Sequence, residues 1–386
     1  MTRGIRPSGM RPRTLTALVL VLAVAGCSGH ATATLSLSPA PSPTLIPTAS
    51  ATATPVPTPI VPHGVFTATG SLMLPRSGAA GTLLPDGEVL VSGGNDGAEL
   101  YDPATGTFHA TGSPIGGGGG PMSVLLRTGR VLGIDAGYGE LYDPATGKFS
   151  EAGSSAFDRD GGAIALLKSG EVLVAGGIGV GPSALYVLRS AELYNPSTGK
   201  FVPTGSMKTG RECFTATTLP SGKVLVAGGD DGSGCNTSEN VFASAEIYDP
   251  QTRKFTPTGS MTTPRQVATA TLLGNGKVLI AGGNDENGPL ASAELYDPST
   301  GKFTLTGSME ITRSHFTATL LLDGRVLIEG DGPAELYSPT TGTFSPTGSM
   351  ATAAYDRTAV RLKDGRVLVF GGQGVGGSTS AELYWP

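Results

Sequence analysis

Arginine and glutamate recur along this chain at spacings that would place like charges in a ring. Five arginines each stand 11 residues before a turn glycine, and seven glutamates open a repeated Glu-Leu-Tyr-type motif. The arginines are Arg76, Arg159, Arg211, Arg265 and Arg313, and the glutamates are Glu99, Glu140, Glu192, Glu246, Glu294, Glu335 and Glu382. An arginine ring could bind an anionic ligand, and the glutamates could line a carboxylate-rich channel. We expect a structural role instead, with each glutamate tied to backbone amides or to an arginine. The arginines would then make charge-assisted bonds between neighbouring repeats.

Other acidic residues occur where a hydrolase or a calcium site could use them. Asp158 and Asp160 flank Arg159, and loops further on carry Asp230, Asp231, Asp285 and Glu286. These residues form no recognised catalytic motif, and aspartate in loops commonly serves turns. The last four leave weak calcium binding open, although they lack the spacing of an EF-hand loop. We predict no other cofactor, no metal site and no catalytic residue set.

The elements that must position these residues are short strands. Within one repeat, residues 214–219 alternate in polarity, 223–227 form an apolar run, and 245–248 and 254–258 flank an Asp-Pro turn. Seven copies follow one another at spacings of 41 to 54 residues. A period in this range, made only of strand-like pieces, is typical of propeller blades. The sequence therefore predicts an all-β fold, a seven-bladed β-propeller of four-stranded antiparallel blades at residues 65–386.

The two ends of this domain predict how the ring closes. The last repeat stops after its third strand, and a segment at 66–73 matches the missing fourth strand. We expect the N-terminal strand to pair with the C-terminal blade and close it. Closure of this kind leaves only short, protected sheet edges.

A Gly-Gly pair after the second strand, with a tyrosine further on, resembles Kelch repeats and the galactose-oxidase-like propellers. The pair stands at 228–229 in the fourth repeat, whereas residues 131–135 of the second repeat lack it. The resemblance covers residues 65–386 and implies the fold. For the oxidases it would also imply copper held by two tyrosines and two histidines, with one tyrosine joined to a cysteine. This propeller contains only His109 and His315, so we expect no copper oxidase activity.

Two cysteines, Cys213 and Cys235, fall at the same end of two antiparallel strands of the fourth repeat. Both therefore lie on one face of the propeller. If the chain is exported, a disulfide between them is expected. Two unpaired thiols are the alternative, and no Cys-x-x-Cys metal motif is present.

The third, fourth and fifth repeats carry extra residues after their second strands, at 178–190, 230–244 and 284–292. These segments belong to adjacent blades and to one face. Loops on a rigid scaffold commonly carry recognition. We therefore predict a binding surface that includes Tyr186, Leu188, Asp230, Asp231, Phe242, Asp285, Glu286 and Leu290.

The first 64 residues predict export and tethering. Residues 1–26 combine an arginine-rich start with an apolar stretch too short to span a bilayer, as in a signal peptide. The sequence Val-Ala-Gly-Cys at 24–27 resembles a bacterial lipobox, which implies that Cys27 is lipidated and becomes the mature N-terminus. An ordinary signal peptide with an incidental cysteine is the alternative. Residues 27–64 are dominated by Ala, Thr, Ser and Pro, which predicts a disordered linker after the lipidated cysteine.

The charge of the chain and its predicted export limit the functions that we expect. Without its signal the chain would carry 22 basic against 31 acidic residues, and it has no basic stripe, so nucleic-acid binding is not expected. We expect a monomer anchored at the cell envelope by lipid only, facing the outside or the periplasm. Its propeller would bind a protein or glycan partner through loops on one face. The alternatives are a carbohydrate-active enzyme with its site at the ring mouth and a scaffold within an envelope complex.

Overall fold

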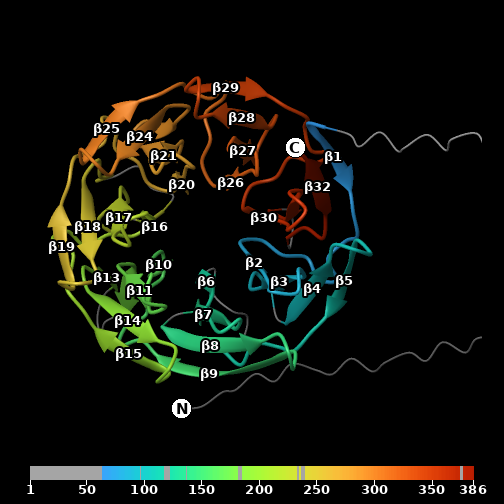
Figure 1. Cartoon of the computed structure of the whole chain (residues 1–386), viewed down its shortest axis with the longest axis horizontal. Coiled ribbons are helices and arrows are strands. Elements are labelled where there is room, and N and C mark those ends of the chain that lie inside the picture. The colour runs from blue at the N-terminus through green and yellow to red at the C-terminus, as the bar shows by residue number, and fades with distance from the viewer. Residues whose placement is uncertain are drawn as a thin grey trace, which may run out of the picture. The chain divides into compact units, whose positions relative to one another are not determined.

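Seven four-stranded antiparallel sheets surround a central axis in the described part of the chain (Figure 1). The computed structural model describes residues 63–386 except 96, 117–121, 136, 181–184, 233, 236–239 and 374–376. All of them belong to the second of two compact units, Met1–Thr58 and Pro59–Pro386. The predictions for the signal peptide, for Cys27 and for the linker up to residue 62 lie outside the described residues. No helix long and apolar enough to cross a membrane occurs among the residues described.

Each blade runs in sequence order from an inner strand to an outer one, apart from the closing blade. The first four blades are β2 (Ala80–Leu83), β3 (Val89–Ser92), β4 (Ala98–Asp102), β5 (Thr107–Ala110); β6 (Met122–Leu125), β7 (Val131–Asp135), β8 (Tyr138–Asp143), β9 (Lys148–Ser154); β10 (Ala163–Leu166), β11 (Val172–Ala175), β14 (Ala191–Asn195), β15 (Lys200–Pro203); and β16 (Thr215–Thr218), β17 (Val224–Ala227), β18 (Ala245–Asp249), β19 (Lys254–Pro257).

The remaining blades are β20 (Thr269–Leu272), β21 (Val278–Ala281), β24 (Ala293–Asp297), β25 (Lys302–Leu305); β26 (Thr317–Leu320), β27 (Val326–Glu329), β28 (Glu335–Ser338), β29 (Thr343–Pro346); and β30 (Arg357–Arg361), β31 (Val367–Gly371), β32 (Ala381–Trp385), β1 (Val65–Ala68). Two small hairpins are added after the second strands of the third and fifth blades. They are β12 (Ile178–Val180) with β13 (Leu185–Val187), and β22 (Asn284–Asp285) with β23 (Gly288–Pro289).

The predicted ring closure is confirmed. β1 pairs antiparallel with β32, from Val65 opposite Trp385 to Ala68 opposite Glu382, so the first and last strands complete the seventh blade. The two strands lie side by side in Figure 1.

The second strand of each blade is buried on both sides because it is sandwiched between two neighbouring blades. In β17, Val224 and Val226 pack with Leu173 of the third blade. Leu225, pointing the other way, packs with Val278 of the fifth blade. Burial of each such side chain contributes about 1.5–3 kcal/mol. The continuous apolar run therefore reflects packing between blades, which also explains why no blade is stable alone.

The motif tyrosines tie each blade to the one before it. The ring of Tyr296 packs on Phe303 with centroids 4.8 Å apart, and its hydroxyl bonds the hydroxyl of Thr258 in the preceding blade at 2.9 Å. The same bond recurs at Tyr101, Tyr142, Tyr248, Tyr337 and Tyr384. Tyr194 departs from this pattern, because Ala152 occupies the threonine position. Its buried hydroxyl has no hydrogen-bond partner in the described part of the chain.

A belt of backbone hydrogen bonds, which we call the inner girdle, links the starts of the inner strands. Cys213 N donates to Gly161 O at 2.8 Å, and Val267 N donates to Cys213 O at 2.9 Å. Across the ring, Asp356 N donates to His315 O, and Gly78 N donates to Asp356 O, both at 3.2 Å. All six residues have φ between 48° and 65°, in the left-handed region. Glycine adopts it freely and the other residues adopt it at a cost, so the girdle imposes this conformation.

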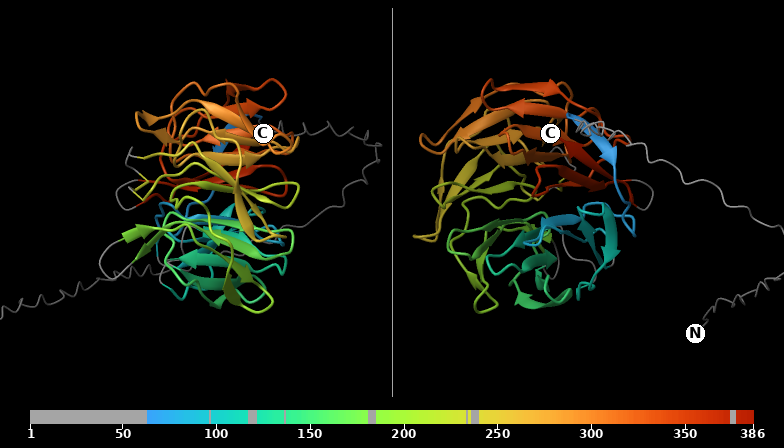
Figure 2. Two further views of the ribbon diagram at one scale, coloured as in Figure 1. Left: turned by 90° about the vertical axis from the view of Figure 1, so that its left-hand side faces the viewer. Right: turned by 45° about the vertical axis from the view of Figure 1, so that its right-hand side comes forward.

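Strand direction separates the two faces of the ring, which Figure 2 shows from the side. The inner strands begin, and the second strands end, on the face that carries the inner girdle and the segments 178–190, 230–244 and 284–292. We call this the loop face. The second strands begin at glycine turns on the opposite face, the turn face, where the outer strands also begin. β1 is an outer strand, and its start places His63 on the turn face.

Candidate binding site at the ring mouth

The repeated arginines and glutamates form buried ion pairs. Arg265 Nη2 lies 3.3 Å from Glu294 Oε1, and both side chains are fully buried. Arg265 Nη1 also donates to the carbonyls of Gly282 and Ser292, at 3.0 and 2.8 Å. Equivalent pairs join Arg76 with Glu99, Arg159 with Glu192, Arg211 with Glu246, and Arg313 with Glu335. Burial lowers the pKa of Arg159, Arg211 and Arg265, and the paired glutamate opposes this shift where it faces the guanidinium.

Each glutamate also accepts backbone hydrogen bonds. Glu294 receives them from the amides of Thr262 and Thr263, at 2.8 and 3.1 Å. Glu140 and Glu382, whose repeats have Gly118 and Ala354 at the arginine position, accept from Gly116 N and from Ala351 N. This geometry favours the structural role over an anion-binding ring.

One part of the arginine prediction is wrong. The side chain of Arg265 bonds residues of its own blade, not of a neighbour. Contact between blades runs instead through the arginine backbone, where Gly283 N of the fifth blade donates to Arg313 O at 2.9 Å. The reason is direction: the guanidinium points along its own blade toward the third strand, while its carbonyl faces backward around the ring.

A cavity of about 750 Å³ opens on the loop face between the second, third and fourth blades. Carboxylates and apolar side chains share its wall. The acidic members are Asp135, Asp158, Asp160 and Glu212, and the apolar ones are Met122, Ile134, Ile178, Val180 and Leu185. Arg159, although it borders the cavity, is paired with Glu192. The free charge at this mouth is therefore negative.

Glu212 is the most perturbed acid of the cavity. Burial is the main reason that its pKa is raised to about 7, and Asp230, which hydrogen-bonds it and repels its negative charge, adds to the same shift. Gly234 N donates to Glu212 Oε1 at 2.6 Å and opposes that shift. Their backbones are joined in both directions, Glu212 N to Asp230 O and Asp230 N to Glu212 O. The nearby carboxyl group therefore favours the protonated form of Glu212, because two close negative charges repel.

The β12–β13 hairpin forms one rim of the cavity and is apolar on its exposed side. Val180 is 64 % exposed and Leu185 is 68 % exposed, and both line the cavity. Tyr186, on the same hairpin, is 42 % exposed. Exposed apolar side chains gathered beside a cavity are a common mark of an interaction site.

The predicted binding residues do not all reach the surface. Leu188 is buried, because its amide bonds Gly177 O and returns the chain to the core. Asp230 is fully buried beside Glu212. Phe242 packs against Arg211, whose Cζ lies 5.3 Å from the centroid of the Phe242 ring. Leu290 is half-buried and forms an isolated antiparallel β-bridge with Arg313. Leu188 and Asp230 are therefore corrections to the predicted surface, whereas Phe242 and Leu290 are half-buried and stay predictions.

The other predicted residues stay accessible but separate. Asp231 and Glu286 are exposed, and half-buried Asp285 accepts from Asn287 N at 2.7 Å in its own turn. No three of the four acids proposed for calcium come within 4.8 Å of one another. The structure therefore does not assemble Asp230, Asp231, Asp285 and Glu286 into one calcium site.

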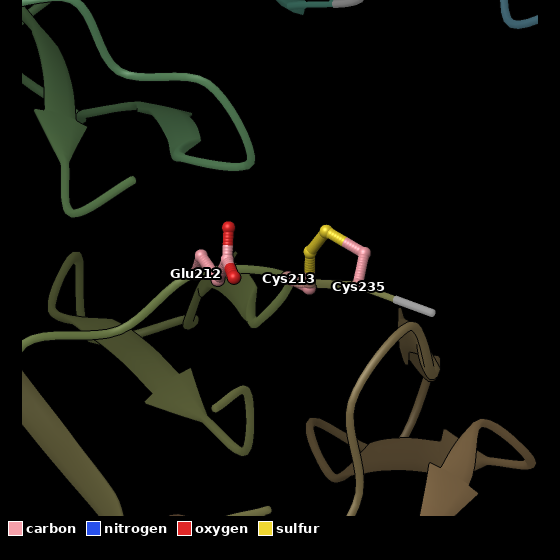
Figure 3. A group of neighbouring side chains, drawn as sticks. All are labelled: Glu212, Cys213 and Cys235. Atoms are coloured by element: carbon pink, nitrogen blue, oxygen red, sulfur yellow. A yellow bond between two sulfur atoms is a disulfide. The ribbon is translucent and has the colours of Figure 1, made fainter. Parts of the chain in front are cut away.

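Cys213 and Cys235 are joined in a disulfide beside Glu212, with their Cα atoms 5.6 Å apart (Figure 3). These three residues are the only cluster of potential metal ligands among the residues described. Because both sulfurs are in the disulfide, they are not free thiolates, and the cluster does not fit a metal. The disulfide instead fixes the segment that carries Gly234 onto the inner girdle, which positions the donor to Glu212.

Comparison with known proteins places the fold. Residues 213–262 and 268–310 match the Kelch motif. The domain is a Kelch-like β-propeller. A fungal alcohol oxidase of the AA5 family, solved in complex with copper, matches 83 % of this chain and 76 % of its own, with 17 % identity and a TM-score of 0.68. The protein YjhT matches 82 % of this chain and 97 % of its own, with 13 % identity and a TM-score of 0.55. Among curated proteins, no sequence matches this chain.

The residues present do not fit a copper centre like that of the galactose-oxidase-like enzymes. His109 lies on β5, an outer strand, with Nε2 3.6 Å from Glu88. His315 lies in the inner girdle of the sixth blade, and His63 lies at the turn face. In the described part of the Kelch-like propeller, no group of three or more His, Cys, Asp and Glu side chains that could hold a metal ion contains a histidine.

Sequence reasoning missed several residues of the mouth. Glu212 directly follows Arg211, one of the arginines found by the repeat spacing. Asp160 follows Arg159 in the same way in the third repeat, so the repeat spacing could have identified both acids as neighbours of the arginine position. Val180 falls within the predicted segment 178–190, whereas Asp135 carries no signal in the sequence. Asp135 and Val180 meet because the second and third blades are neighbours.

Proposed function

We propose that this Kelch-like propeller is an interaction module that binds a protein partner on its loop face. The observation that carries the proposal is the β12–β13 hairpin, whose exposed Val180 and Leu185 border a cavity lined with carboxylates. A partner segment that presents a basic side chain next to apolar ones would complement both features. A glycan would be recognised by the same carboxylates but would leave the apolar rim uncovered.

Tethering forms part of the same proposal. The predicted lipid anchor at Cys27 would hold the propeller at the cell envelope, with the chain joining the propeller at His63 on the turn face. The loop face lies on the opposite side of the ring from that junction and stays accessible to a partner outside the membrane. The module would act as a monomer.

The test compares two matched pairs of substitutions. Val180→Ser with Leu185→Ser removes the apolar rim. Val202→Ser with Leu305→Ser removes the same residue types from exposed outer strands, where they are 45 % and 61 % exposed. In affinity purification from envelope extracts, a partner retained by the native chain and by the control pair, but lost with the rim pair, supports the proposal. Equal retention by both pairs contradicts it.

A carbohydrate-active enzyme is the second candidate, and the raised pKa of Glu212 favours it. A carboxyl group that titrates near 7 beside a second carboxyl can act as a general acid. Glu212→Gln should then abolish polysaccharide hydrolysis and leave the melting temperature close to its native value. If no polysaccharide is cleaved by the native chain, this candidate fails.

A further inference from the structure

A second cavity, of about 660 Å³, lies on the turn face where the ring closes. Its apolar floor is built from the ends of three blades: Pro103, Ala104, Leu322, Trp385 and Pro386. Leu322 is 67 % exposed. Trp385 is the only tryptophan of the chain. We call this cavity the closure pocket.

Two arginine–aspartate pairs and a held tryptophan ring line the closure pocket. The guanidinium of Arg366 lies over the ring of Trp385, 5.0 Å from its centroid, and pairs with Asp364 at 2.7 Å. Arg325 pairs with Asp323 at 2.6 Å on the other side. The indole Nε1 of Trp385 donates to Thr67 Oγ1 at 2.9 Å, which fixes the ring. With each cation matched by an anion, the pocket suits an uncharged occupant.

The chain itself leads into this pocket. His63 is one of its lining residues and its Nδ1 lies 2.7 Å from Pro386 O. Gly64 N donates to Trp385 O at 2.6 Å, so the backbone is held against the pocket at this point. The four residues that precede His63 in the sequence are Pro59, Ile60, Val61 and Pro62.

We propose that residues 59–62 dock into the closure pocket and cover Trp385 and Leu322. Three arguments support this occupant. The segment is attached at the pocket wall, so it binds at a high effective concentration. Residues 28–62 contain no Asp, Glu, Lys or Arg, which matches the balanced charge of the pocket. Proline-flanked extended segments bind aromatic-lined grooves at low entropic cost.

The sequence contains a natural control for this proposal. Leu45 and Ile46, followed by Pro47, form a second pair of bulky apolar residues beside a proline in the same linker. This pair is far from His63 along the chain. If docking depends on attachment next to the pocket, only the pair at 60–61 should matter.

Fluorescence of the single tryptophan reads the pocket directly. In the full chain, Ile60→Ser with Val61→Ser should move the emission maximum to longer wavelength. It should also raise acrylamide quenching about twofold, because Trp385 loses its cover. Leu45→Ser with Ile46→Ser should change neither quantity. Leu322→Ser, which alters the opposite wall, should give the same change as the pair at 60–61 while the fold stays intact by circular dichroism.

Two results would overturn the docking proposal. One is unchanged emission and quenching in the Ile60→Ser, Val61→Ser variant. The other is an equal change in both double variants, which would mean that linker composition, not docking, affects the signal. A change of emission with protein concentration or with added sugar, but not with the linker variants, would assign the pocket to a second copy or to a glycan instead.

Discussion

The buried Arg265–Glu294 pair shows how one side chain can organise a whole blade. Its guanidinium bonds two carbonyls, a serine hydroxyl and a carboxylate, all in the fifth blade. Removing one partner of such a pair leaves a buried charge without compensation, whereas removing both is often tolerated.

Arg265→Ala should therefore lower the free energy of unfolding by about 3–5 kcal/mol, the usual cost of breaking a buried pair. The double variant Arg265→Met with Glu294→Met should lose much less. Urea unfolding of the three chains checks both statements. If Arg265→Ala left stability unchanged and abolished binding of an anionic ligand, the arginines would have the recognition role that the geometry disfavours.

The hydrogen bonds between motif tyrosines and threonines predict one substitution that lowers stability and one that raises it. Thr258→Val removes the partner of the buried Tyr296 hydroxyl and should cost about 1–3 kcal/mol, the penalty for an unsatisfied buried group. Ala152→Thr supplies the missing partner of Tyr194 and should add about 1 kcal/mol. Thermal unfolding measures both changes. A lower melting temperature for Ala152→Thr would show that the irregular pairing of β9 with β8 leaves no room for the hydroxyl.

At the scale of elements, the segments after the second strands divide into a structural part and an accessible part. Leu188 and Phe242 anchor their segments to the core and to Arg211, whereas Tyr186 and the apolar residues of the β12–β13 hairpin project outward. A replacement of these segments by the short loop of the first blade preserves the fold only if the anchoring residues are kept.

Leu188→Ala should destabilise the propeller by about 2–5 kcal/mol, as expected for a buried leucine. Tyr186→Ala, two residues away and 42 % exposed, should leave the melting temperature within the error of measurement. Differential scanning calorimetry separates the two. Equal losses for both variants would mean that the hairpin is packed as tightly as the blade beneath it.

The sequence predicts the fold well because every repeat carries the same signals. The apolar second strand, the turn glycine and a Glu-Leu-Tyr or Glu-Ile-Tyr motif appear in all seven copies, and the structure has the seven blades and the closing pair that these signals indicate. Repetition identifies the residues that all blades share, and these residues form the fold. It gives no information about residues that occur in only one blade. The mouth cavity is built from Asp135, Val180 and Glu212, which lie on three different blades, and no spacing along the chain reveals their proximity.

At the scale of the whole molecule, two buried acids predict how stability depends on pH. Burial raises the pKa of Glu329 to about 7, and Thr317 and the nearby Arg357 only partly oppose this. Glu212 is raised to about 7 as well, by burial and by Asp230. The folded state therefore keeps protons that the unfolded chain releases near its ordinary value of 4.5. The stabilisation is complete below about 4.5 and is lost as pH rises through about 7.

Glu329→Gln should flatten this profile, because the amide does not titrate. Between pH 5 and pH 7.5, the native chain should lose stability on the order of 3 kcal/mol through Glu329 alone, and the variant should lose less. Glu286→Gln, at an exposed site, is the matched control and should follow the native profile. Chemical unfolding at several pH values measures the slopes, and parallel slopes for all three chains would contradict the assignment.

The pairing of β1 with β32 has a consequence for the timing of synthesis. Thr67 and Leu383, which face each other in that pair, are 316 residues apart in the chain. At the usual rates of translation, β1 waits on the order of half a minute before its partner exists. During that interval six blades can assemble while the ring stays open, and the strand that waits is only four residues long. An unpaired strand this short exposes few backbone groups with which another nascent chain could pair. The order of strands therefore limits the exposed sheet edge until the ring closes.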